Sequence, residues 1–157
     1  MTYVSHMIEH ILLAQLLPIP LVLAAGSRLR WRMPMPLAWA IGVAAMVGTS
    51  MPPAYRLAEA SLPLNWAMRA TLILAGFVFW LAVLGHGQAM RPGPGAMVTY
   101  LVSACFATTL AGVYIAFSAT TTDQQVAGLI MWIPCCVVYL SASVAVVVRG
   151  LRPGTLN

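Results

Sequence analysis

Two histidines near the start of the chain have the spacing of a metal-binding pair. His6 and His10 lie four residues apart in SHMIEHILL (5–13), and residues four apart share one face of a helix. Met7 offers a thioether beside them, and imidazole with thioether suits copper better than calcium or magnesium. Glu9 flanks the same face. Histidines that are simply solvated at a membrane surface are the alternative, and the spacing alone leaves both interpretations open.

A second polar cluster, TTTDQQVAGLIMW (120–132), stands where an apolar segment begins. Thr122 and Gln125 have the spacing of a capping box, in which side chains satisfy the free N–H groups of a helix start. Asp123 then falls in the first turn, where the positive end of the helix dipole favours a carboxylate. Helix capping is therefore a sufficient explanation for these three residues.

Capping does not account for the whole cluster. Gln124, and Trp132 deeper along the same helix, remain unexplained. Met131 follows Asp123 by eight residues, which returns it to nearly the same helical face and makes it a candidate soft ligand beside His6, Met7 and His10. The residues interpreted as capping or partner-contacting are Glu9, Thr122, Asp123, Gln124, Gln125 and Trp132.

The elements that must position these side chains are apolar. The chain of 157 residues is 61% hydrophobic and 7% charged, too few charges to cover a soluble domain. About 20 apolar residues cross a bilayer as a helix, and no alternating barrel pattern occurs. We expect one all-α domain over residues 1–157, a polytopic membrane helical bundle with about five transmembrane helices. The predicted spans are Met7–Ala25, Met33–Met51, Asn65–Gly85, Ala96–Ala119 and Val126–Val148.

The arginines, which supply all eight basic residues, predict the orientation. One side of the membrane receives Arg28, Arg30, Arg32, Arg91, Arg149 and Arg152, and the other receives Arg56 and Arg69. Basic residues favour the cytoplasmic side, which places the N-terminus outside and the C-terminus in the cytoplasm of a multi-pass protein of the inner (plasma) membrane. His6, His10 and Asp123 then share the outer face. We expect a short interfacial helix in loop 51–65, and no cleavable signal peptide, because no basic residue precedes the first span.

The remaining reactive side chains indicate no catalysis. Cys105, Cys135 and Cys136 lie inside spans and are interpreted as small packing residues, with a buried copper(I) thiolate site as the alternative. His86 is interpreted as interfacial on the inner side. We find no carboxylate pair, nucleophile with a base, phosphate loop or haem-attachment sequence, so we do not expect an enzyme. No basic patch with exposed aromatics suggests nucleic acid, and membrane lipid is the expected surrounding.

Two stretches resemble a known family. SHMIEH followed by ILLAQLLPIPLVLAAG is similar to the HM-x-QH-LL opening of the multi-spanning cytochrome c oxidase assembly factors called CtaG, and DQQVAGLIMWIP (123–134) is similar to their DQQLAGLIMWVP sequence. MPPAYRLAEASLPLN (51–65) and GFVFWLAVLG (76–85) resemble the middle region. The chain differs in carrying Glu9 in place of glutamine, no histidine in the middle loop, and Arg69 where a second-helix histidine is expected.

The resemblance implies copper-dependent maturation of a haem–copper oxidase. It predicts an assembly factor that presents copper(I) on the outer membrane face, with oxidase subunits as partners. A stable accessory subunit that binds no metal is the alternative. A small transporter with Glu9, His10 and Asp123 along its pathway is weaker, because all three acidic residues of the chain lie at span ends or in loops, whereas a transport pathway needs ionisable groups inside the membrane.

Overall fold

The computed structural model describes residues 2–25, 33–85 and 92–151. Within these residues the chain is helical and contains no strand, which confirms the all-α prediction. The elements are α1 (Tyr3–Ile11), the π-helix η1 (Leu12–Leu16), α2 (Pro18–Ala25), α3 (Met35–Ser50), α4 (Pro52–Ala60), α5 (Leu62–Leu84), α6 (Pro94–Ser118) and α7 (Thr122–Gly150).

The helices match the predicted spans, with one difference in length. Among the described residues, four helical runs are long and apolar enough to cross a membrane: Tyr3–Ala25, Leu62–Leu84, Pro94–Ser118 and Thr122–Gly150. The predicted second span corresponds to α3, whose 16 residues extend about 24 Å at about 1.5 Å per residue, less than a hydrocarbon core of about 30 Å. Together α3 and α4 form a fifth candidate span that is bent by 73°.

The bend has a local cause in two prolines. Pro52 and Pro53 open α4, and a residue that precedes proline is disfavoured in the α conformation. Met51 accordingly has φ −68° and ψ 143°, which ends α3 and begins α4. The short helix expected in the loop 51–65 is therefore present, and its direction is set by the proline pair.

The first span widens at its centre for a similar reason. Pro18 has no N–H to donate to the carbonyl of Ala14, and the helix turns through a π-type bond in which the Leu17 N–H donates to the Leu12 carbonyl at 2.8 Å. Helix α5 packs on this segment at Gly76. A Cβ added there would lie 2.3 Å from the Ala14 carbonyl oxygen, so only glycine permits this approach.

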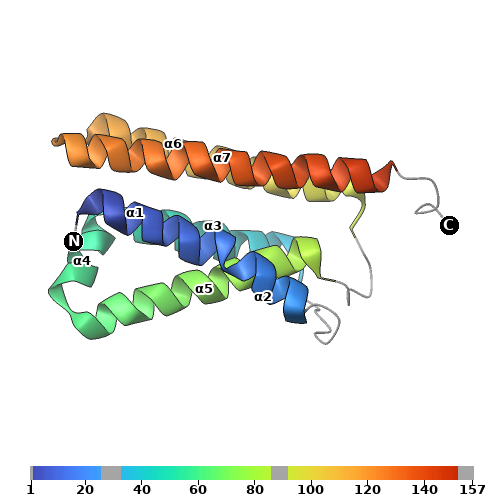
Figure 1. Cartoon of the computed structure of the whole chain (residues 1–157), viewed down its shortest axis with the longest axis horizontal. Helices are drawn as coiled ribbons and strands as arrows, with labels where there is room; N and C mark the ends of the chain where they lie inside the picture. The colour runs from blue at the N-terminus through green and yellow to red at the C-terminus, as the bar shows by residue number, and fades with distance from the viewer. Residues whose placement is uncertain (1, 26–32, 86–91, 152–157) are drawn as a thin grey trace.

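The bundle has α6 and α7 side by side, packed over α1, α3 and α5 (Figure 1). Helices α1 and α7 both begin at the end of the bundle where α4 lies, and α7 runs to the opposite end (Figure 1). We call the end that contains Tyr3, α4 and Thr122 the N-terminal end of the bundle. The sequence clusters around His6 and Asp123 therefore lie at the same end.

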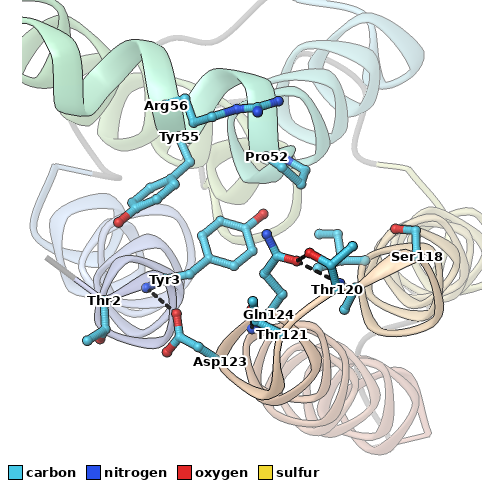
Figure 2. A pocket seen from close by; sticks show the side chains of 12 residues that line it. Thr2, Tyr3, Pro52, Tyr55, Arg56, Ser118, Thr120, Thr121, Asp123 and Gln124 are labelled. Carbon is cyan, nitrogen blue, oxygen red and sulfur yellow. Dashed lines mark hydrogen bonds between the residues drawn. The ribbon is translucent and has the colours of Figure 1, made fainter.

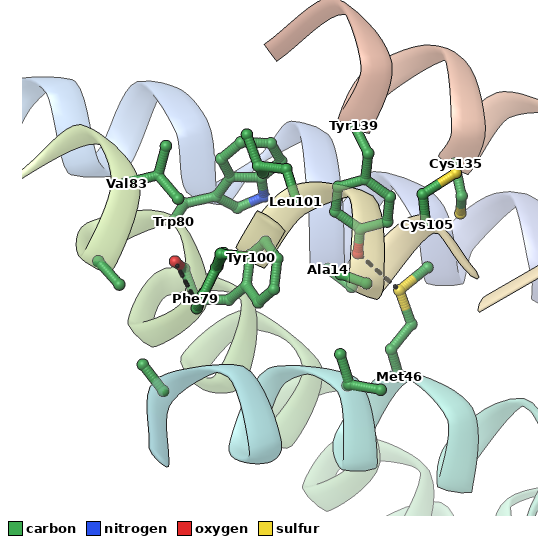
Figure 3. Packing of buried hydrophobic residues seen from close by; sticks show 14 of the residues in the cluster. Ala14, Met46, Phe79, Trp80, Val83, Tyr100, Leu101, Cys105, Cys135 and Tyr139 are labelled. Carbon is green, nitrogen blue, oxygen red and sulfur yellow. Dashed lines mark hydrogen bonds between the residues drawn. The ribbon is translucent and has the colours of Figure 1, made fainter. Parts of the chain in front are cut away.

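Aromatic rings fill the core between these helices (Figure 3), and one amide is buried with them. The ring of Phe79 lies 4.7 Å from that of Tyr100 and 5.6 Å from that of Tyr139, measured between centroids. Gln15, in the π-helical segment, is 1% exposed, and its Nε2 donates to the Tyr139 hydroxyl at 2.6 Å and to the Met46 sulfur at 3.2 Å. The amide thereby joins three helices, α3, α7 and its own.

Several residues used to predict the orientation lie outside the described residues, namely Arg28, Arg30, Arg32, Arg91 and Arg152, together with His86. Arg149 is described and lies in the last turn of α7, away from the N-terminal end of the bundle. The orientation across the membrane stays a prediction.

Candidate functional site

The two histidines lie together in the interior at the N-terminal end of the bundle. Helix α1 starts at a cap, because the Thr2 hydroxyl oxygen accepts from the Ser5 N–H at 3.1 Å. One turn later His6 and His10 are only 5% and 1% exposed, and their ring centroids are 5.4 Å apart. The spacing of four residues has placed both imidazoles in one buried pair, as the sequence predicted.

Helix α3 determines which nitrogen of His10 carries the proton. The His10 Nε2 lies 3.1 Å from the Met46 carbonyl oxygen and 2.9 Å from the Thr49 hydroxyl oxygen. A carbonyl only accepts, and the Thr49 hydroxyl already donates to the Ala45 carbonyl at 2.6 Å. Nε2 must therefore be the N–H, and in neutral imidazole Nδ1 then carries a free lone pair.

One ring nitrogen of each histidine lacks a hydrogen-bond partner in the described part of the chain. The Nδ1 of His10 and the Nε2 of His6 are both buried, and neither has a hydrogen-bond partner among the described residues. Buried polar atoms usually have partners. Histidines that bind metals generally donate their second ring N–H to a carbonyl or carboxylate, which is the arrangement that Met46 provides for His10.

The two methionines of the predicted ligand set lie apart from the histidines, Met7 on another face of α1 and Met131 on α7. Met7 and Met131 are fully buried in one apolar cluster with Tyr3, Ala111, Ile115 and Ala127. The His6 ring instead faces α4, with its centroid 4.9 Å from that of Tyr55. Consecutive helical residues point about 100° apart. The structure thus brings Met7 to Met131 and His6 to His10, as two neighbouring clusters.

Glu9 forms an ion pair with α5 beside the histidines. The Arg69 Nε lies 2.7 Å from Glu9 Oε1, and an outer guanidinium nitrogen donates to Oε2 at 3.1 Å. Arg69 also lies over the Trp66 ring, 5.0 Å from its centroid. A cavity of about 10 Å³, roughly one water, separates this pair from His6 and His10, and Asn65, Met68 and Leu72 of α5 complete its lining with Leu13.

Asp123 contacts the start of another helix. It lies in the first turn of α7, as predicted, and its Oδ2 accepts from the Tyr3 backbone N–H at 2.8 Å (Figure 2). That N–H belongs to the first turn of α1, where the helix itself supplies no acceptor. The Tyr3 hydroxyl donates in turn to the Ser50 carbonyl at the end of α3. Asp123 and Tyr3 thereby connect three helices.

The predicted capping box is wrong by one residue. The N-cap of α7 is Thr121, whose hydroxyl oxygen accepts from the Gln124 N–H at 3.3 Å. The Gln124 side-chain oxygen accepts from the Thr120 N–H at 3.0 Å (Figure 2). Three consecutive threonines offer the same chemistry, so residue types alone do not select the register. Thr122 and Gln125 are exposed, and Trp132 is 36% exposed on α7.

A cavity of about 350 Å³ opens at the N-terminal end of the bundle (Figure 2). The starts of α1, α4 and α7 and the end of α6 surround it, and Tyr3, Arg56, Asp123 and Gln124 are among its lining residues. Polar and apolar side chains both line the cavity.

Cys135 and Cys136 point in different directions, because consecutive residues of a helix are about 100° apart. The Cys105 sulfur lies 3.0 Å from that of Cys136, which also lies 3.1 Å from the Thr109 hydroxyl oxygen. Cys135 points elsewhere and its sulfur lies 3.9 Å from Gln15 Nε2. All three are free thiols.

Sequence reasoning missed the residues that hold the histidines and Asp123 in place. These are Tyr3, Met46, Thr49 and the pairing of Arg69 with Glu9. It also missed Gln15, which joins the first span to α3 and α7. Only Gln15 had a signal, as a lone amide within an apolar span, where polar side chains commonly bond between helices.

These observations define a polytopic helical membrane protein with a buried histidine pair and a polar cavity at one end. The family model of the cytochrome c oxidase caa3 assembly factor (Caa3_CtaG) matches residues 1–152. The chain therefore belongs to this family, which confirms the resemblance of its two sequence stretches. Comparison with curated proteins and comparison with solved structures returned no match.

Proposed function

We propose that this assembly factor presents copper(I) to a haem–copper oxidase at the outer face of the inner membrane, using His6 and His10. The family supports a role in oxidase assembly. The observation that carries copper is the pair of buried, unpartnered nitrogens, His6 Nε2 and His10 Nδ1. A neutral imidazole offers one unprotonated nitrogen as a ligand, which for His10 is Nδ1, and imidazole suits copper.

An incomplete ligand set fits transfer of the ion as cargo. Two imidazoles hold the ion while leaving a position for a ligand of the recipient. Met7 and Met131 lie in one apolar cluster beside another face of α1, and we propose that their thioethers join the imidazoles only if α1 rotates. The neighbouring cavity, lined by Asp123 and Gln124, is where we propose that an oxidase subunit docks.

The test is the double variant His6→Ala, His10→Ala. We expect it to lose at least tenfold in copper(I) affinity, measured against a chelator under reducing conditions, and to lower the yield of active oxidase while its own abundance holds. Met97→Leu conserves volume at a buried methionine of α6 that lies outside the predicted ligand set, and it serves as the matched control, with binding retained. Wild-type copper binding and full oxidase activity in the double variant would instead favour a metal-free accessory subunit, which should then co-purify stoichiometrically with the mature oxidase.

A further inference from the structure

We infer that Arg69 is a specificity-determining residue, which selects a monovalent ion at the histidine pair by withholding the carboxylate of Glu9. The inference rests on the proposed function, namely that His6 and His10 bind a metal ion. It concerns which ions they accept, and it assigns to Arg69 the exclusion of divalent ions such as zinc(II).

Both oxygens of Glu9 are engaged by the same guanidinium. Oε1 lies 2.7 Å from Arg69 Nε and Oε2 lies 3.1 Å from an outer nitrogen, the two-point geometry that makes arginine a strong carboxylate partner. The Trp66 ring holds the guanidinium from a second direction, 5.0 Å away. Glu9 and Arg69 are 27% and 28% exposed, so lipid and protein shield the pair from much of the solvent.

Without Arg69, Glu9 is positioned to act as a metal ligand together with the two histidines. His6, Glu9, His10 and Arg69 line one cavity of about 10 Å³. Among the described residues, no three histidine, cysteine or acidic side chains now come together as a metal site. The nearest candidate for a third ligand, Glu9, is held in the ion pair with Arg69 instead.

The charge and number of ligands explain the selectivity. Zinc(II) takes four ligands, drawn from cysteine, histidine and carboxylate, or three in open sites. Two neutral imidazoles supply neither the number nor the negative charge, whereas soft copper(I) is suited to few nitrogen or sulfur ligands. The positive charge of Arg69 also neutralises the negative charge of Glu9, so the pair offers a dication no net attraction. Loss of Arg69 would leave the carboxylate free and its negative charge uncompensated.

The experiment uses full-length protein purified in detergent, with cobalt(II) as a spectroscopic probe and zinc(II) in competition with it. Arg69→Gln should bind cobalt(II) and zinc(II) at least tenfold more tightly than wild type and develop visible d–d absorption. Adding Glu9→Gln in the same chain should abolish the gain, because the amide carries no charge. Arg56→Gln is the matched control, since it removes an exposed arginine of α4 that lines the other cavity and should leave divalent binding unchanged.

Two results would separate this inference from the proposed function. A folded Arg69→Gln protein that retains copper(I) binding but gains no divalent affinity would overturn the inference and leave the copper proposal standing. The wild type could instead fail to bind copper(I) while Arg69→Gln gains cobalt(II) affinity that depends on Glu9. That result would uphold the exclusion of divalent ions by Arg69 and reject the copper proposal. If Arg69→Gln is not recovered folded, Arg69→Lys takes its place, because lysine cannot hold both carboxylate oxygens in the same way. This variant should show a smaller gain in divalent-ion affinity, and no gain would overturn the inference.

Discussion

Asp123 joins the starts of two helices that are 120 residues apart in the chain. Its carboxylate accepts from the Tyr3 N–H in the first turn of α1 while lying in the first turn of α7. Both positions lie at positive ends of helix dipoles. A single carboxylate therefore stabilises two helix starts, and this role requires an acceptor oxygen with a negative charge.

Substitutions of Asp123 should separate the contribution of its acceptor oxygen from that of its negative charge. We expect Asp123→Ala to lower the free energy of unfolding by about 1–2 kcal/mol, because a helix-start N–H loses its acceptor. Asp123→Asn keeps an oxygen and should cost about 0.5 kcal/mol, mainly through the dipole. Thermal unfolding in detergent measures both, with Gln125→Ala, at an exposed neighbour, as control. Oxidase maturation that falls in Asp123→Asn at unchanged abundance would indicate partner contact instead.

At the scale of elements, α6 and α7 approach each other closely through small residues. A Cβ added to Gly128 would lie 2.7 Å from both the Gly112 carbonyl oxygen and the Ala116 nitrogen. Membrane helices associate through such small residues, because lipid offers no hydrophobic driving force between them. The approach positions α7, and with it Asp123 and Met131, against α1.

Gly128→Ala should therefore destabilise the bundle by about 1–3 kcal/mol, the usual cost of overpacking. Gly48→Ala is the matched control, because Gly48 is exposed in helix α3 and an added Cβ meets nothing within 4 Å. That control should be neutral, or stabilising by up to about 1 kcal/mol, as alanine is the better helix former. Equal melting temperatures for the two variants would contradict the close packing of α6 on α7.

At the scale of the whole molecule, the N-terminal end of the bundle collects the histidine pair, Asp123 and the larger cavity. The α1 and α7 starts meet there through the Tyr3–Asp123 bond, whereas Arg149 lies in the last turn of α7. If this end faces outward, the described part of the chain places every candidate site residue toward the outer side.

Labelling tests that orientation. Thr121→Cys should react with a membrane-impermeant maleimide in intact cells, because Thr121 is exposed at the start of α7, and a reporter fused after Asn157 should read cytoplasmic. The wild-type chain is the control, since its three free cysteines lie inside α6 and α7. A cytoplasmic Thr121 would place the histidine pair on the wrong side for the proposed delivery.

The helices, their approximate bounds and the pairing of His6 with His10 were predictable from the sequence. Burial in a membrane is a sum of transfer free energies along the chain, and a spacing of four is a local property of one helix. The family was also predictable, because DQQVAGLIMWIP is a contiguous stretch.

Contacts between helices were decided only by the tertiary structure. Glu9 meets Arg69 across 60 residues, His10 meets Met46 across 36, and Tyr3 meets Asp123 across 120. In a soluble helix an apolar stripe marks the inward face, but a membrane helix is apolar toward lipid as well as toward its neighbours. Its rotation is set by small residues, proline-induced bends and polar bonds between helices. For this reason Met7 and Met131 pack together while the histidines face α3 and α4.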